Sequence, residues 1–455
     1  MCGLAGSTAG GSASVEPMLE RIAHRGPDGS GVYEQDGVSH GHVRLALVDL
    51  TDAAAQPFRR AGSVLSFNGE IWNWRQLRAD CEASGAVFVS QSDTEVLAAV
   101  LERDGISGLN TLDGMFAFAW SSADGQHWLV RDNFGKIPIY VAKVRGGYCW
   151  ASERKAFPRG VQAVAVPPGQ AFNLKTGEWV QWYSMPAAGR TGPSEVRALL
   201  RAGVNKRLEA DAPVCCLISG GLDSGLVLAM ARERSADVTA FTAVYDLQSA
   251  DAVSARRLCS AFGVRLVEVT ATATDADFFA AMQAIEIASK AQIEIAAMCL
   301  PLAKRIRAEG FKACLSGEAA DELFGGYGNF CIAASRATEP EVVKLRREQL
   351  RKMSRGNFVR CNKAFMSAGV ECRLPFMEQA MVESAVQMGK QDSPPGKKLL
   401  KAAAGGLVPP WVIKRPKDTF QGGSGISASI AKRINSPIKW YNAELRKQFG
   451  YRPKD

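Results

Sequence analysis

One short loop, residues 219–224, constrains the fold of this chain more than any other stretch. Its sequence is Ser-Gly-Gly-Leu-Asp-Ser; an apolar run, 214–218, precedes it, and a segment with helical spacing, 226–232, follows. The pattern predicts a strand, a tight turn and a helix. Two adjacent glycines let the backbone approach a ligand closely, and a helix N-terminus offers unpaired N–H groups to an anion. The loop predicts a phosphate site, although a glycine turn that serves packing alone would explain it equally well.

The polar residues of this loop favour the phosphate interpretation. Two hydroxyls, Ser219 and Ser224, and the carboxylate of Asp223 converge on one turn. Such oxygens suit a pyrophosphate that carries a bound Mg²⁺. No Gly-Lys-Ser/Thr follows, so this is not a Walker loop. It resembles the pyrophosphate loop of ATP pyrophosphatases, which cleave ATP to AMP and pyrophosphate. The resemblance implies ATP and Mg²⁺ as cofactors.

Length and composition indicate a globular protein of more than one domain. The chain has 455 residues, of which 47% are hydrophobic and 22% are charged. Its eleven cysteines form no CxxC pair and it has only four histidines, so neither a zinc site nor a disulfide framework is predicted. No apolar run approaches the roughly 18 residues of a membrane span, and the N-terminus lacks a signal-peptide pattern. We expect a cytoplasmic protein without a membrane partner.

The net charge of +9 is concentrated in the second half. The segment through Arg190 holds 17 Lys and Arg against 19 Asp and Glu, and the remainder holds 38 against 27. A positive field favours ATP and other anions, although most of these residues are explained as a solvated surface. No run interleaves aromatic with basic residues, so a nucleic-acid partner is not expected.

The first half alternates β-rich runs with turns. The expected strands are 43–50, 64–67, 115–120, 128–131, 139–144 and 148–151, and helices are expected over 73–84 and from a cap at Ser92. Runs of strands with few helices indicate an α+β domain. A segment rich in Pro and Gly, 185–193, reads as a linker. We therefore expect one domain over 1–185 and a second over 194–455.

The second half has a different rhythm. Strands are expected at 214–218, 238–244, 264–269 and 313–315, with helices between them. This βαβ series predicts an α/β domain with a parallel, doubly wound sheet, in which ligands bind at the carboxyl ends of the strands. Ser219 and Ser316 each follow an apolar strand, so both are expected at that edge.

Cys2 is a candidate nucleophile. If Met1 is removed, the α-amino group of Cys2, with a pKa of about 8, can act as general base for its own thiol. An early cysteine alone means little, but six motifs accompany it. They are His24-Arg-Gly-Pro-Asp28, Arg44-Leu-Ala-Leu-Val-Asp49, Phe67-Asn-Gly-Glu-Ile71, Ser92-Asp-Thr-Glu95, Asp113-Gly-Met-Phe-Ala117 and Arg131-Asp-Asn-Phe-Gly135. Their order and spacing resemble the glutamine amidotransferase domain of N-terminal-nucleophile (Ntn) hydrolases, which implies an αββα sandwich.

The second half adds further motifs. They are the phosphate loop, Ser316-Gly-Glu-Ala-Ala-Asp-Glu-Leu-Phe-Gly-Gly-Tyr327, Asn362-Lys-Ala and Val370-Glu-Cys-Arg-Leu-Pro-Phe376. With them, the chain from Met1 to about Gly425 resembles the glutamine-dependent asparagine synthetase family. The resemblance implies a ligase that takes ammonia from glutamine and aminates an adenylated carboxylate.

For the glutaminase half, the resemblance implies a thioester on Cys2. Asn68 and the backbone N–H of Gly69 would form the oxyanion hole, which stabilises the charge that develops on the carbonyl oxygen. The residues implied to bind glutamine are Arg44, Leu45, Val48, Asn68, Gly69, Glu70 and Asp93. Ammonia would pass internally to the second site.

For the synthetase half, the resemblance implies ATP contacts at Ile218, Ser219, Gly220, Gly221, Asp223, Ser224, Ala243, Ser316 and Gly317. Asp223 and Asp321 would hold Mg²⁺. Glu318 would contact the acyl-adenylate, and Lys417 would neutralise charge during adenylation, with a structural salt bridge as its alternative role. Both residues are candidate catalytic groups.

The acceptor is the least determined feature. Ala319 stands where the family pattern has a second glycine, and Met377 and Glu378 stand where it has Leu and Asp. Glu371 and Glu378 are candidate acceptor-site carboxylates, and for Glu371 a structural role is favoured over a catalytic one. L-Aspartate is the default acceptor, and another small or biosynthetic carboxylate is the alternative.

A third hypothesis is a non-catalytic protein that binds glutamine or nucleotide to regulate a partner. The presence of Cys2, both Mg²⁺ carboxylates and Lys417 argues against it. The expected partners are therefore the small-molecule substrates, and a homodimer stays open.

Overall fold

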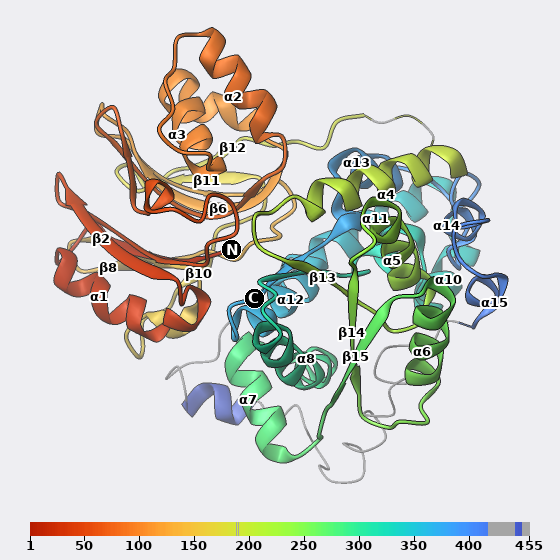
Figure 1. The fold of residues 1–455 in the computed structure, drawn as a ribbon. Helices are drawn as coiled ribbons and strands as arrows, with labels where there is room; N and C mark the ends of the chain where they lie inside the picture. Colours follow the sequence, from red (N-terminus) through yellow and green to blue (C-terminus); the bar gives the residue numbers. More distant parts are fainter. Residues whose placement is uncertain (188, 190, 417–441, 448–455) are drawn as a thin grey trace.

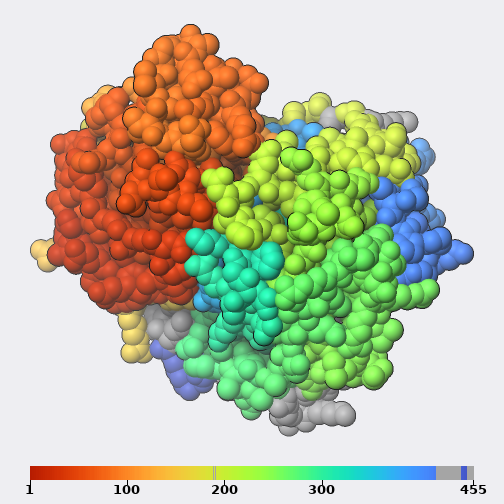
Figure 2. Space-filling view, viewed as in Figure 1, coloured from red at the N-terminus to blue at the C-terminus, as the bar shows by residue number. Residues whose placement is uncertain are grey.

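The computed structural model describes residues 1–187, 189, 191–416 and 442–447. Two bodies lie side by side, the N-terminal one built on two antiparallel sheets and the other on one parallel sheet (Figure 1). In the space-filling view the two halves press against each other along a broad boundary (Figure 2).

The first half is a four-layer αββα sandwich. The first sheet has the order β10-β8-β9-β1-β3-β2, and the second β12-β11-β7-β6-β5-β4. The strands of the first are β1 (Gly3–Ser7), β2 (Gly29–Gln35), β3 (Val38–Arg44), β8 (Tyr140–Val144), β9 (Gly147–Ala151) and β10 (Val164–Ala165). Those of the second are β4 (Phe58–Arg60), β5 (Ser63–Ile71), β6 (Gly114–Ser121), β7 (His127–Arg131), β11 (Gln170–Asn173) and β12 (Trp179–Gln181).

Three apolar clusters hold these layers together. One lies between the sheets, where Leu4 and Trp150 meet Ala117 and Leu129. Helix α1 (Ser12–Arg21) covers the outer face of the first sheet, and α2 (Trp74–Ala83) and α3 (Asp93–Asp104) cover the second. The central strands β1, β5 and β6 are buried on both faces, which explains their apolar runs, whereas the edge strands β2 and β12 are largely exposed. The α+β sandwich predicted from the sequence is confirmed.

The second half is a doubly wound α/β domain. Its sheet has the order β15-β14-β13-β16-β17 and every neighbouring pair is parallel. The strands are β13 (Val214–Leu217), β14 (Thr239–Val244), β15 (Arg265–Thr270), β16 (Ala313–Leu315) and β17 (Glu371–Arg373). Helices α4 (Pro193–Leu208), α5 (Leu222–Arg234) and α6 (Ala250–Phe262) pack together, as do α7 (Asp275–Ile285), α8 (Lys290–Ala308) and α12 (Asn357–Met366). The predicted parallel doubly wound sheet is confirmed.

Further helices complete this half. They are α9 (Ala320–Phe324), α10 (Gly328–Arg336), α11 (Glu339–Met353), α13 (Gln379–Ala385), α14 (Lys398–Ala403) and α15 (Pro410–Lys414). No helix among the described residues is long and apolar enough to cross a membrane.

One expected strand is placed wrongly. The segment 43–50 was expected to be extended, but β3 ends at Arg44 and residues 45–50 form a loop. Its apolar side chains Leu45 and Leu47 are buried, yet they enter the core from a loop. An apolar run of this length does not by itself distinguish a strand from a buried loop.

Candidate active site

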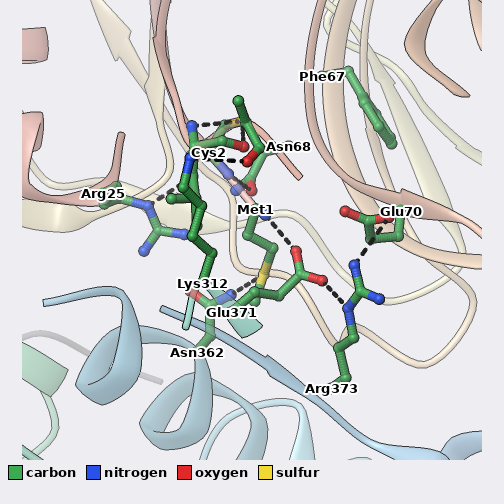
Figure 3. Close-up of polar contacts among 12 residues, drawn as sticks. Met1, Cys2, Arg25, Phe67, Asn68, Glu70, Lys312, Asn362, Glu371 and Arg373 are labelled. Atoms are coloured by element: carbon green, nitrogen blue, oxygen red, sulfur yellow. Dashed lines mark hydrogen bonds and ion pairs between the residues drawn. The ribbon is translucent and has the colours of Figure 1, made fainter. Parts of the chain in front are cut away.

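Cys2 lies in a buried position just before β1. Its backbone N–H donates to Asn68 Oδ1 at 2.8 Å, and its Sγ lies 3.4 Å from the Leu45 nitrogen (Figure 3). Burial raises the pKa of the Cys2 thiol, so the thiol is neutral near pH 7. Attack on an amide would therefore need a base to remove its proton.

The residues predicted to bind glutamine surround Cys2. A small cavity of about 30 Å³ has Arg44, Leu45, Val48, Gly69, Glu70 and Asp93 in its wall, together with Cys2. The glycine is required on β5, because a Cβ at Gly69 would lie 2.1 Å from the Met115 carbonyl oxygen. Six of the seven predicted residues thus line this cavity and the seventh, Asn68, binds the Cys2 N–H, so three separate sequence motifs meet at Cys2.

The charges around this cavity suit an amino acid. The guanidinium of Arg44 is held by the carbonyl oxygens of Asp49 and Thr51, at 2.5 and 2.8 Å. Asp93 Oδ2 accepts from the Ile71 N–H at 3.0 Å, and burial together with nearby Glu371 raises the pKa of Asp93 to about 6. A cation and a carboxylate on one cavity match the α-carboxylate and α-ammonium of glutamine.

Glu371 does not lie at the nucleotide end of the sheet. It begins β17, at the amino end, whereas ligands occupy the carboxyl ends. Its buried carboxylate contacts the Met1 ammonium and accepts from Arg373 Nε at 2.5 Å (Figure 3). Burial alone would raise the pKa of Glu371, but these two cations lower it. The prediction of an acceptor-site Glu371 is corrected: it joins the two halves beneath the glutaminase site.

The phosphate loop has the predicted geometry. Ser219 and Ser224 hydroxyls lie 3.2 Å apart, and the Ser219 N–H donates to Ser224 Oγ. Gly220 has a φ of +70°, and a Cβ there would lie 2.4 Å from the Ala255 nitrogen. A Cβ on Gly317 would lie 2.7 Å from the Ser224 nitrogen. The loop after β16 therefore contacts residues 223 and 224, which follow β13, at a distance that requires a glycine at position 317. Gly220 allows the loop after β13 to approach α6 in the same way.

A cavity of about 470 Å³ opens at this edge of the sheet. The predicted ATP residues in its wall are Ile218, Ser219, Asp223, Ser224, Ala243, Ser316 and Gly317. Gly221 faces an adjoining cavity, and Gly220 packs against α6. Glu318 and Asp321 also line the larger cavity, so residues from the ends of three strands meet in one place.

Asp223 and Asp321 converge on one point. Lys397 Nζ lies 2.5 Å from Asp223 Oδ2 and 2.7 Å from Asp321 Oδ1. Two carboxylate oxygens that share one ammonium could also share Mg²⁺, which prefers oxygen ligands and keeps substrate phosphates among them. No group of three or more His, Cys, Asp or Glu in the described ranges is arranged to hold a metal by itself. Lys417 lies outside the described residues.

Glu318 belongs to a polar network on the α12 side of the cavity. It contacts the Arg360 guanidinium, and its Oε1 accepts from Asn357 Nδ2 at 2.8 Å. The same amide donates to Glu322, whose pKa is raised to about 7 by burial and by Glu318. The carboxylate at the predicted adenylate contact is therefore held in a defined position by two donors.

Ala319 adopts an unusual backbone conformation. It has a φ of +83° and lies in the cavity wall. A non-glycine residue in the left-handed region stores strain of order 1 kcal/mol. The methyl group of Ala319, next to Glu318, is therefore accommodated at the cost of backbone strain.

Glu378 is the second correction. Its carboxylate lies 2.5 Å from Lys206 Nζ and 3.0 Å from Arg207 Nη1, both on α4, and it does not line the nucleotide cavity. The segment after β17 turns away from the sheet edge through a short 3-10 helix, Pro375–Met377, and packs on α4. Glu378 therefore binds α4 and lies outside the wall of the nucleotide cavity.

Sequence reasoning missed three functional side chains of this arrangement. Lys397 follows a glycine and has a φ of +60°, Arg360 pairs with Glu318, and Arg25 Nε donates to the Cys2 carbonyl at 2.9 Å. Arg25 stood inside a recognised motif, which was a usable signal. Lys397 and Arg360 are two among 55 basic residues, and nothing local separates them from surface lysines and arginines.

Comparison with known proteins agrees with this arrangement. Residues 1–176 match the glutamine amidotransferase domain, and residues 195–356 and 332–441 match asparagine synthase. The glutamine-hydrolyzing asparagine synthetase B of Escherichia coli (strain K12) is 31% identical over 442 residues, which cover 89% of this chain and 78% of that protein. The glutamine-hydrolyzing asparagine synthetase 3 of Arabidopsis thaliana is 30% identical over 422 residues, with 88% and 71% covered.

A solved structure, glutamine phosphoribosylpyrophosphate amidotransferase from B. subtilis, covers 76% of this chain and 79% of its own, with 16% identity and a TM-score of 0.37. That likeness is too low to carry an argument, and the fold assignment rests on the sheets described above. The family matches and the relatives of about 30% identity lead to one conclusion: this chain belongs to the glutamine-hydrolysing asparagine synthetase family.

Proposed function

We propose that this protein is a glutamine-hydrolysing, ATP-dependent ligase that converts a carboxylate into a primary amide. The observation that supports the proposal is that one chain carries both arrangements of candidate site residues. Cys2 lies within the predicted glutamine contacts, and Asp223 and Asp321 converge at the end of a parallel sheet. The names of the relatives make L-aspartate the default acceptor and L-asparagine the product.

Residues 1–185 would form the glutaminase domain. The Cys2 thiol would attack the glutamine amide carbon, ammonia would leave, and water would release glutamate from the thioester. Asn68 and the Gly69 N–H would stabilise the oxyanion, and Arg44, Glu70 and Asp93 would hold the amino-acid head, beside Leu45 and Val48. The base would be the α-amino group of Cys2 after Met1 is removed.

Residues 194–455 would form the synthetase domain. A carboxylate oxygen of the acceptor would attack the α-phosphorus of ATP, and pyrophosphate would leave. Ammonia would then attack the acyl-adenylate, lose a proton and displace AMP. Ser219–Ser224 would hold the phosphates, and Glu318 would face the adenylate. Asp223 and Asp321 would hold Mg²⁺, which supplies charge neutralisation when bound; Lys417 is proposed for the same task.

A second acceptor class is favoured by one observation. Beside the polar network of Gln292, Asn357 and Arg360, the α8 and α12 wall of the cavity has an apolar part, formed by Ile295, Cys299, Leu302, Cys361 and Phe365. Ala319 adds a methyl group beside Glu318. Such a wall would accept an acid with an apolar body, so other carboxylates belong in the test.

Product analysis tests the proposal. The protein is incubated with ATP, Mg²⁺, glutamine and a panel of acids that includes L-aspartate, and AMP, pyrophosphate, glutamate and amide are measured. We expect all four products with one acid at least. Absence of AMP with every acid would contradict adenylation, and absence of glutamate from protein with verified Met1 removal would favour a non-catalytic regulator.

Two further proposals concern the cellular location and the oligomeric state of the protein. We propose a cytoplasmic location, tested by cell fractionation, and a homodimer, tested by light scattering of the purified protein. Neither is needed for the reaction, because each site is built within one chain.

A further inference from the structure

We propose that Glu286 and Lys363 are positioning residues that hold the two sites in register, so that ammonia made at Cys2 is used at the adenylation cavity. The inference rests on the proposed function. Neither residue touches the cavity around Cys2 or the nucleotide cavity. They lie between the two halves, and each makes contacts that lead toward one site.

Lys363 is a fully buried lysine on α12. Its Nζ contacts the carboxylate of Glu286 and donates to the Tyr140 hydroxyl at 3.1 Å. It also lies 4.7 Å from the centre of the Tyr140 ring, on β8 of the first half. Both partners of the ion pair have no exposed side-chain surface. A charge this deeply buried is costly unless its partners stay in place, so the pair defines one geometry.

Glu286 connects this lysine to the glutaminase half through the backbone. It ends α7 with a φ of +60°, and its two carboxylate oxygens accept from the N–H groups of Arg154 and Lys155, at 3.0 and 2.7 Å. These N–H groups begin a 3-10 helix, Arg154–Ala156, just after β9. One carboxylate therefore binds a helix of the synthetase half and a helix start of the glutaminase half with charge-assisted hydrogen bonds.

From that helix start a short series of contacts reaches the nucleophile. Glu153, the preceding residue, binds Arg25 Nη1 through Oε1 at 2.7 Å. Arg25 in turn donates from Nε to the Cys2 carbonyl at 2.9 Å. Glu153 and Arg25 are both buried without exposed side-chain surface. The position of Glu286 is thus linked to the position of the Cys2 backbone through two fully buried ion-paired residues.

From Lys363 the contacts reach the cavity within one helix. Cys361 of α12 lines the nucleotide cavity, and Asn357 and Arg360 hold Glu318 there. Helix α12 is therefore a wall of the nucleotide cavity, and Lys363 ties this wall to Glu286 and, through it, to the contacts that lead to Cys2.

A purely structural pair and a positioning pair have different consequences. If the pair only stabilises the fold, its loss lowers the melting temperature but does not change how glutamine hydrolysis and amide formation are matched. If it sets the register of the two sites, its loss lets ammonia escape before it reaches the adenylate. The ratio of glutamate released to amide formed distinguishes the two, because each half-reaction uses its own residues.

The test uses the full-length protein with the acid identified by product analysis. Lys363→Met removes the charge, and the double variant Glu286→Gln/Lys363→Met removes both charges, so that no buried ion is left unpaired. We expect the glutamate-to-amide ratio to rise on the order of fivefold over wild type in each variant, within the range typical of coupling between sites. Glutaminase activity alone, and amide formation from saturating ammonium salt, should stay within about twofold of wild type.

Lys206→Met is the matched control. It removes another ion pair across the same boundary, Lys206 Nζ to Asp113 Oδ2 at 2.6 Å, together with the contact of Lys206 to Glu378 within the second half. Neither contact involves α12 or Glu153. Its ratio should equal that of wild type. An unchanged ratio in the folded double variant, or an equal rise in Lys206→Met, would overturn the inference even if Lys363→Met fails to fold. A wild-type protein that forms no glutamate or no AMP would instead contradict the proposed function, and with it this inference.

Discussion

The two sites of this molecule hold their charges in different ways. Around Cys2, a cavity of about 30 Å³ is lined by the loop after β3, by β5 and by the start of α3, and burial raises the pKa values of the thiol and of Asp93. At the sheet edge, a cavity of about 470 Å³ holds carboxylates that are already paired, Asp223 and Asp321 with Lys397 and Glu318 with Arg360. The first site is built to activate one nucleophile, and the second must open ion pairs to admit a charged ligand.

The largest expected effect separates the two sites completely. Cys2→Ala should lower glutamine-dependent amide formation on the order of a thousandfold, because no other group can form the thioester. Amide formation from added ammonium salt should stay close to wild type, since the nucleotide cavity is untouched. Both rates are measured on the same preparation. Loss of both in a folded variant would mean that Cys2 has another role or that the two sites are not separable.

A smaller effect tests the paired charges of the second site. Lys397→Met leaves Asp223 and Asp321 facing each other without their shared lysine, so unfolding free energy should fall by about 2–3 kcal/mol. Added Mg²⁺ and ATP should reduce the difference in unfolding free energy between the variant and wild type. The reason is that the metal can take the place of the lysine ammonium between the two carboxylates. Urea unfolding with and without Mg²⁺ and ATP measures this. A difference that Mg²⁺ and ATP leave unchanged would contradict a metal site there.

The pH dependence tests the role of burial at the first site. The pKa of Asp93 is raised to about 6, and its carboxylate form is required to bind the ammonium of glutamine. Protonation of the Cys2 α-amino base already lowers kcat/KM for glutaminase activity below about pH 8, and protonation of Asp93 should add a second acid limb, a further fall of about tenfold per pH unit, below pH 6. Asp93→Asn should lack this second limb and be slow throughout. A second limb that persists in Asp93→Asn would assign it to another group, such as Glu70.

The smallest expected effect concerns the corrected residue. Glu378→Asp should leave the acceptor KM within about twofold of wild type, because the carboxylate binds Lys206 and Arg207 on α4 and does not line the cavity. The shorter side chain should lower the free energy of unfolding by about 1 kcal/mol and so lower the melting temperature slightly. Steady-state kinetics with the preferred acid and a thermal melt provide the two readings. A tenfold change in the acceptor KM would bring Glu378 back to the acceptor site.

The sequence by itself determined the parts that depend on local pattern. The strand, glycine turn and helix at 214–232 follow from alternation, from Gly220 and from helical spacing, and the fold class follows from the rhythm of each half. The residues around Cys2 can be identified from the sequence because each stands inside a contiguous motif. Features that depend only on neighbouring residues can be predicted from the sequence alone.

Only the tertiary structure decided which distant charges meet. Glu371 and Glu378 are seven residues apart, yet one lies at the amino end of the sheet beneath Met1 and the other packs on α4. Lys397 reaches two aspartates 174 and 76 positions away, and Lys363 finds Glu286 from another helix. A buried charge is stabilised by whichever partner the packing of helices and strands brings to it, and sequence spacing does not encode that partner. The clustering of motif residues around Cys2 could therefore be predicted, and the contacts between the halves could not.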